Sequence, residues 1–152
     1  MLKIKNIVVP TDFSELSLRA FNYAKDLAET MDAKIHLITV IDNTPPMLSK
    51  HDKTVSESVM MDSVEQQAKK QMAELAEEIN DDADIDIIQV IRKGVDYEEI
   101  VKYSNESHAD LIVLATHGRT GVLHTVLGSV AEKVIQYSKR PVLVIHPEEE
   151  EV

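Results

Sequence analysis

The sequence predicts one α/β domain with a doubly wound parallel sheet and helices on both faces. The chain has 152 residues, which is enough for one domain with a substantial core and too few to expect two. Short runs rich in Ile and Val recur along it, and such runs are typical of buried strands. Helical patterns lie between these runs, and strict alternation of strand and helix favours a parallel sheet with right-handed crossovers.

Five apolar runs are the expected strands. They span residues 3–10, 34–41, 85–92, 110–116 and 141–146. The first helical pattern shares one apolar face among Ala20, Phe21, Ala24, Leu27 and Ala28. The second places an apolar stripe on Val59, Val64, Ala68, Met72, Leu75 and Ile79, at spacings that keep one side of a helix apolar.

Two further helices are expected near the strand ends that follow. In the third, Asp96 and Glu99 have the spacing of an N-cap and its reciprocal partner. The fourth is SVAEKVIQY, which opens at Ser129. Each of the first four strands is therefore followed by a helix, as a doubly wound sheet requires.

The charge balance and the absence of cysteine limit the classes of function. Lys and Arg number 16 and Asp and Glu 27, a net charge of −11, which opposes nonspecific attraction to nucleic acid or anionic membranes. No apolar run approaches the roughly 20 residues that span a bilayer. We therefore expect neither nucleic acid nor a membrane as a partner. The chain has no cysteine, which excludes thiolate chemistry and fits a cytoplasmic location.

One domain is expected over residues 1–147, followed by an acidic tail at 148–152. The tail contains four consecutive glutamates and is interpreted as a solvated end, with partner binding as the alternative. The longest irregular stretch spans residues 42–58, is polar and contains Pro45 and Pro46. A connection of this length is either a mobile lid or a disordered insertion.

Ligands of open α/β sheets bind at the carboxyl ends of the strands, where strand order reverses. Asp12 follows the first expected strand, and its carboxylate could accept hydrogen bonds from a base or a ribose. Alternatively, Asp12 or Ser14 caps the following helix. Val40 lies at the end of the second strand, and its backbone could contact an adenine edge if the sheet is locally unpaired there. Core packing is the alternative role for Val40.

Glycines follow the third and fourth expected strands. Gly94 is explained either by a tight turn or by close approach of a ligand. Gly118 follows the fourth strand, and Gly128 and Ser129 open the next helix. Their backbone N–H groups could face one anion with help from the helix dipole, or the glycines could only punctuate a loop. Neither GxGxxG nor GxxxxGK[ST] occurs.

Local side chains could complete such an anion site in an otherwise acidic protein. Arg119 would add a positive charge, and hydroxyl donors are available on Thr116, Thr120 and Ser129. From the residues alone, a phosphate-binding segment and an ordinary loop are both open for this stretch.

The chain resembles the nucleotide-binding branch of the universal stress protein family over residues 2–147. The resemblance rests on VVPTDFSE near the start, TVID after the second strand, and ATHGRTGVLHTVLGSVAEKVI near the end. The family signature is Gly, two residues, Gly, nine residues, Gly, then Ser or Thr. It matches at Gly118, Gly128 and Ser129, whereas Ala115 stands at the first glycine position and Gly121 falls within the spacer.

This resemblance implies an adenine nucleotide alpha hydrolase-like fold with strand order 3-2-1-4-5, and a homodimer built along the last strand, residues 140–145. We expect ATP as the ligand, because the glycine and Ser129 segment offers several donors, with AMP as the alternative because a monophosphate would use a subset of them. Mg²⁺ could arrive with ATP and need few protein ligands. By resemblance, Asp12 recognises the adenosine part and the Val40 backbone contacts adenine. Phosphates would be held by Gly118, Gly128 and Ser129, with further contacts from Pro10, Thr11, Gly94, Thr116, His117, Arg119 and Val130.

Three functions remain for comparison. The first is an ATP-binding stress-response switch, which the retained Gly128-Ser129 signature favours. The second is a slow ATP hydrolase or phosphotransferase, which needs a metal and an aligned group for attack. His117 and His124 are the nearest histidines, but the sequence demonstrates no metal spacing around them, so we assign no catalytic base. The third is a dimeric scaffold without nucleotide.

Overall fold

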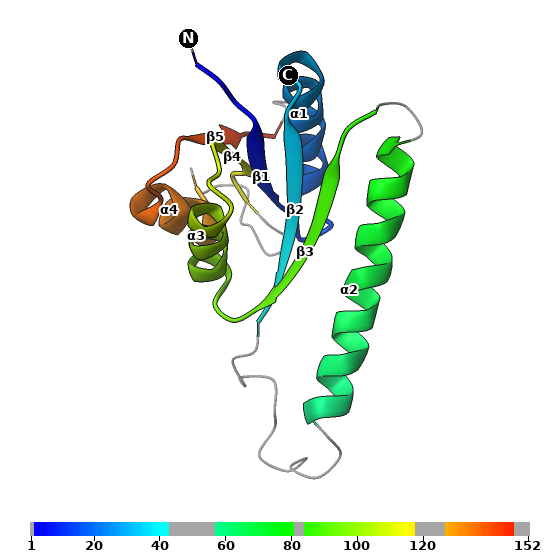
Figure 1. The fold of residues 1–152 in the computed structure, drawn as a ribbon. Coiled ribbons are helices and arrows are strands. Elements are labelled where there is room, and N and C mark those ends of the chain that lie inside the picture. Colours follow the sequence, from blue (N-terminus) through cyan, green and yellow to red (C-terminus); the bar gives the residue numbers. More distant parts are fainter. Residues whose placement is uncertain (1, 43–56, 81–83, 118–126, 148–152) are drawn as a thin grey trace, which may run out of the picture.

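A computed structural model describes residues 2–42, 57–80, 84–117 and 127–147. Strands and helices alternate along these segments (Figure 1). Their order is β1 (Asn6–Pro10), α1 (Glu15–Met31), β2 (Lys34–Ile41), α2 (Glu57–Asn80), β3 (Ile87–Lys93), α3 (Asp96–Glu106), β4 (Leu111–Ala115), α4 (Ser129–Tyr137) and β5 (Val142–Ile145). The five predicted strands and the four predicted helices are confirmed.

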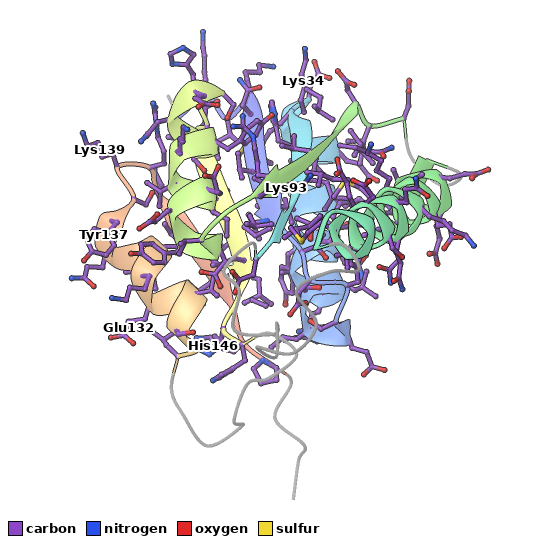
Figure 2. All side chains as sticks on the ribbon, turned by 90° about the horizontal axis from the view of Figure 1, so that it is seen from below. Lys34, Lys93, Glu132, Tyr137, Lys139 and His146 are labelled. Atoms are coloured by element: carbon purple, nitrogen blue, oxygen red, sulfur yellow. The ribbon has the colours of Figure 1, made fainter. Side chains whose placement is uncertain are left out.

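The five strands form one sheet in the order β3-β2-β1-β4-β5, and every neighbouring pair is parallel. The order expected from the family resemblance is therefore confirmed. Because every neighbouring pair is parallel, the carboxyl ends of the strands lie at one edge of the sheet, and β2 and β3 end toward the bottom of Figure 1. Figure 2 looks onto that edge, where Lys93 marks the end of β3 and His146 follows β5.

Each face of the sheet carries its own apolar cluster. On one face, Phe21 and Ala24 of α1 and Met72 of α2 pack with Ile35 and Leu37 of β2. On the other face, Ile100 of α3 and Val134 of α4 pack with Val8, Ile38 and Ile112. Because side chains alternate along a strand, consecutive apolar residues serve both clusters. This accounts for the continuous Ile and Val runs in the sequence.

One member of the predicted stripe on α2 is not buried. Ala68, Met72, Leu75 and Ile79 are buried as expected, but Val64 is 46% exposed. The neighbouring Glu65 forms an ion pair with Lys93, the last residue of β3, at 2.7 Å. Val64 therefore lies level with the end of β3, and among the described residues no strand covers it there. Val59 belongs to the same prediction, but its side chain lies outside the described part.

The predicted cap of the third helix is also wrong. The N-cap of α3 is Val95, with no side-chain hydrogen bond, and Asp96 is already the first helical residue. The Asp96 carboxylate instead accepts from the Tyr97 backbone N–H at 2.6 Å. Glu99 lies against Gly94, since a Cβ built on Gly94 would stand 3.0 Å from Glu99 Cγ.

Some predictions fall outside the described residues. The proposed lid lies mostly at 43–56, although α2 already begins at Glu57, and the acidic tail lies at 148–152. Within the described segments, no helix combines the length and apolar character needed to cross a membrane.

Candidate functional site

The direction of chain winding reverses between β1 and β4. From β1 the chain moves outward through β2 to β3, and then returns to place β4 and β5 on the other side of β1. Ligands of open α/β sheets bind outside the carboxyl ends of the two strands at such a switch point. The residues that follow these two strands are Thr11 and Asp12 after β1, and Thr116 and His117 after β4.

Hydrogen-bonded pairing between β1 and β4 stops early at this edge. β1 pairs with β2 over five residue pairs, ending at Pro10 and Ile38, but it pairs with β4 only through Ile7↔Leu111 and Val8↔Ile112. Pro10 explains the difference. Thr11 donates its N–H to Ile38 of β2 at 2.8 Å, so by alternation the nitrogen of Pro10 faces β4, and proline has no N–H to donate.

The backbone of Val40 extends past the end of β1 on the other side. Ile38 directs its carbonyl toward β1, where it accepts from Thr11, and Ile41 directs its carbonyl toward β3, where it accepts from Gly94 at 2.9 Å. By alternation, Val40 directs its N–H and C=O toward β1. Its position is two residues beyond the last β1–β2 pair. One donor and one acceptor are thus presented side by side over the end of β1.

Asp12 is partly buried in the turn between β1 and α1. Its Oδ1 accepts the backbone N–H of Ser14 at 3.0 Å. Ser14 is the N-cap of α1, and its side chain accepts from the Ser17 backbone N–H at 3.3 Å. The capping alternative is therefore settled in favour of Ser14, and the Asp12 carboxylate is held at the carboxyl end of β1 by a local turn.

The start of α4 packs tightly against the end of β4. Gly128 donates its N–H to the carbonyl of Thr116 at 2.6 Å. A Cβ on Gly128 would stand 2.8 Å from that oxygen and 3.3 Å from His117 Cα. Thr116 is completely buried, and its hydroxyl bonds with His117 Nδ1 at 2.9 Å. These residues fix the approach of α4 to the switch point, and the structure alone explains why position 128 is glycine.

The first turn of α4 lies beside the end of β4. Gly128 is its N-cap and has no side-chain cap bond, so the N–H groups at the N-terminus of this helix lack that partner. Ser129 is exposed and Val130 partly buried. A helix N-terminus favours negative charge, but α4 also carries Glu132 in its first turn, and this side chain is exposed (Figure 2).

The remaining predicted residues are placed as follows. Gly94 adopts a φ of 149°, which glycine tolerates. It follows β3, an outer strand of the sheet that β2 separates from β1. Gly118 and Arg119 lie outside the described residues, so their part in the site stays a prediction. In the portions of the chain that the structure describes, no cluster of three or more His, Asp or Glu residues could hold a metal ion.

The sequence interpretation missed Phe13, in the turn that carries Asp12, and Ser17, near the start of α1. Phe13 adopts a left-handed backbone with a φ of 64°, and the buried Ser17 hydroxyl lies 3.1 Å from Thr11 Oγ1. No local pattern indicates a left-handed phenylalanine. A serine six residues after Thr11 also gives no signal before the turn is known.

Comparisons with known proteins agree with this architecture. Residues 3–146 match the model of the universal stress protein family. Universal stress protein MJ0531 of Methanocaldococcus jannaschii is 37% identical over 142 residues, covering 93% of this chain and 81% of that protein. The solved structure of MJ0577, a universal stress protein of the same organism, has a TM-score of 0.83 at 31% identity and covers 97% of this chain and 99% of that one.

A solved universal stress protein in complex with cAMP has a TM-score of 0.69 at 25% identity, covering 95% of this chain and 98% of that one. The family match spans nearly the whole chain, and the alignments cover 81% of MJ0531 and 98% or more of the two solved structures. Sequence and fold therefore agree, and the chain belongs to the universal stress protein family.

Proposed function

We propose that this protein binds an adenine nucleotide, preferentially ATP, at the carboxyl ends of β1 and β4 and acts as a nucleotide-dependent switch in a stress response. The observation that carries the proposal is the backbone of Val40. Its N–H and C=O face the space beyond β1, where the ladder to β2 has already ended at Ile38. A neighbouring donor and acceptor match the edge of adenine, which also offers one acceptor and one donor.

The other groups around this space fit the rest of the nucleotide. The Asp12 carboxylate is an acceptor-only group, and ribose hydroxyls are donors. The N-terminus of α4 offers N–H groups with Ser129 beside them, which suits phosphate oxygens. A structural relative was solved with cAMP, and this supports an adenine-containing ligand. Mg²⁺ would arrive with ATP, because it keeps several waters and needs few protein ligands.

ATP is preferred over AMP because the α4 terminus and the predicted contacts of Gly118 and Arg119 offer more donors than one phosphate uses. Mass spectrometry of ligand released from purified, denatured protein tests this directly. ATP is the expected species. Release of AMP alone would mean that the ligand is AMP and not ATP. A protein that neither retains nor rebinds any adenine nucleotide would overturn the proposal.

The switch is proposed to act through a homodimer. β5 is an outer strand of the sheet, and Leu143 at its centre is 37% exposed, so a second copy could cover it. Nucleotide shifts a conformational equilibrium only if its affinity differs between the two states. Light scattering of wild-type protein and Leu143→Glu, each with and without ATP, tests the dimer: the wild type should be dimeric and the variant monomeric.

The absence of cysteine from the sequence fits the cytoplasmic location that we propose.

A further inference from the structure

The buried hydroxyl groups of Thr11 and Ser17 are hydrogen-bonded to each other beside the turn that carries Asp12. Thr11 Oγ1 accepts the backbone N–H of Phe13 at 3.0 Å and lies 3.1 Å from Ser17 Oγ. Ser17 Oγ donates to the carbonyl oxygen of Ser14 at 2.8 Å. Thr11 and Ser17 are 6% and 4% exposed. These contacts therefore link β1 to the first turn of α1 around Asp12 without touching its carboxylate.

The number of hydroxyl hydrogens fixes which group donates in each of these hydrogen bonds. A hydroxyl has one hydrogen to donate, and Ser17 uses its hydrogen on the Ser14 carbonyl, so Ser17 Oγ accepts from Thr11. The order is then Phe13 N–H to Thr11, Thr11 to Ser17, and Ser17 to the Ser14 carbonyl. Each hydroxyl donates once and accepts once. Valine at position 11 would remove the middle of this series of hydrogen bonds and leave the Phe13 N–H and Ser17 without their partner.

These hydrogen bonds hold Phe13 in a left-handed backbone conformation that a phenylalanine rarely adopts. Three non-glycine residues among those described have positive φ, namely Phe13, Asp32 and His108. Asp32 is the C-cap of α1 and His108 lies just after α3, where left-handed residues are common. Phe13 instead precedes a helix and has a bulky side chain, for which such a φ is unusual. Strained residues of this kind cluster at functional sites.

We infer that Thr11 and Ser17 are positioning residues, which hold the Asp12 carboxylate in the orientation that accepts a hydrogen bond from the ribose of the bound nucleotide. The inference rests on the proposed nucleotide function. Thr11 fixes the chain before Asp12 through its N–H on Ile38, and it fixes the chain after Asp12 through its hydroxyl on Phe13. Asp12 is thus held between two anchors that belong to one threonine.

The test compares ATP with 2′,3′-dideoxy-ATP, which lacks the ribose hydroxyls, by calorimetric titration of nucleotide-free protein. Wild type should prefer ATP by about tenfold, the value of one hydrogen bond to a charged group. Asp12→Asn should lose most of this preference. Thr11→Val should lose it too, through weaker ATP binding and unchanged binding of the dideoxy compound. Thr11→Ser, which restores the hydroxyl, should recover the preference.

Ser17→Ala provides a second variant should Thr11→Val fail to fold, because alanine suits a helix. It should weaken the preference for ATP, and circular dichroism checks that each variant is folded. The positioning role is overturned if Asp12→Asn loses the preference while folded Thr11→Val or Ser17→Ala keeps it. A wild-type protein that binds neither nucleotide, or that shows no preference, would instead refute the proposed nucleotide function or its ribose contact.

Discussion

Gly128 lies so close to Thr116 that its N–H reaches the Thr116 carbonyl at 2.6 Å and an added Cβ would stand 2.8 Å from the same oxygen. This contact joins the first turn of α4 to the end of β4. The two nearest atoms, Thr116 O and His117 Cα, are both backbone atoms. A side chain at position 128 could therefore not be accommodated by the movement of a flexible side chain.

Gly128→Ala should therefore lower stability, whether or not a nucleotide is bound. We expect a loss of about 1–3 kcal/mol in the free energy of unfolding, as for overpacking at a closely packed position. Denaturant unfolding measures it. Ser129→Ala is the matched control, because Ser129 is exposed, and it should change stability little. Equal stability of Gly128→Ala and wild type would show that the contact is looser than described.

Pro10→Ala should extend the ladder between β1 and β4. Alanine restores an N–H that faces β4, where pairing now ends at Val8↔Ile112, and the two strands should draw together. We expect nucleotide affinity to fall several-fold and the new amide at position 10 to be protected from hydrogen exchange. Pro141→Ala is the control, since Pro141 is exposed and lies just before β5. Rapid exchange of the new amide with undiminished affinity would contradict this role of Pro10.

His36 should make stability depend on pH in the weakly acidic range. Its Nδ1 lies 2.6 Å from the Tyr103 hydroxyl and its Nε2 lies 3.0 Å from Asn6 Oδ1. Since Asn6 Oδ1 can only accept, Nε2 carries the proton and the neutral ring accepts from Tyr103 at Nδ1. Burial lowers the pKa of His36 below 6.5, Lys34 lowers it further, and Asp86 opposes them.

The sign of the effect follows from proton binding. As pH falls below 6.5, the unfolded chain protonates His36 before the folded protein does, so the free energy of unfolding decreases until the lower folded pKa is reached. Arg92 of β3 lies over the Tyr103 ring, 5.2 Å from its centre, and forms an ion pair with Glu106 of α3 at 2.7 Å. Denaturant unfolding across this range should show a shallower pH dependence for His36→Gln. Identical slopes in both proteins would remove His36 as the cause.

The contact between Lys93 and Glu65 should be visible in the pKa of Glu65. Lys93 Nζ lies 2.7 Å from Glu65 Oε2, and Lys69 Nζ lies 3.6 Å from Oε1. The hydrogen bond from Lys93 is the main reason that the pKa of Glu65 lies below 4.5. The stabilising effect is therefore present above pH 4.5 and is lost as pH falls through the folded pKa.

Lys93→Met should return the pKa of Glu65 toward 4.5 in an NMR titration, and Lys69→Met should move it less. A larger change in Lys69→Met would mean that the helix pair, and not the link from β3 to α2, sets this pKa.

The fold could be predicted from the sequence because its signals are local. The run KIHLITVI became β2 with the predicted bounds of 34 and 41, and SVAEKVIQY became α4 from Ser129 to Tyr137. Val64 was misplaced because helical periodicity does not show where the neighbouring sheet ends. The Asp96 cap was misplaced because the spacing of an N-cap and its partner also occurs within a helix that has already begun.

The sequence could indicate individual residues of the candidate site, but not how they are oriented or which residues they contact. Asp12 and Val40 stand out by their position after strands, but the direction of the Val40 backbone depends on the register of β2 against β1 and β3. The effect of Pro10 likewise depends on which neighbour its nitrogen faces. The left-handed Phe13 and the bond between Thr11 and Ser17 are set by tertiary contacts, which leave no local signal in the sequence.

The central claim, that the switch point between β1 and β4 binds ATP, is tested most directly by calorimetric titration of ATP with Mg²⁺ into nucleotide-free wild type and Asp12→Asn. Asparagine keeps an acceptor for the Ser14 N–H but removes the charge. The account predicts saturable binding of one ATP per wild-type chain and about tenfold weaker binding by the variant, with similar thermal stability. Absence of binding by wild type, or equal affinity in both proteins, would contradict it.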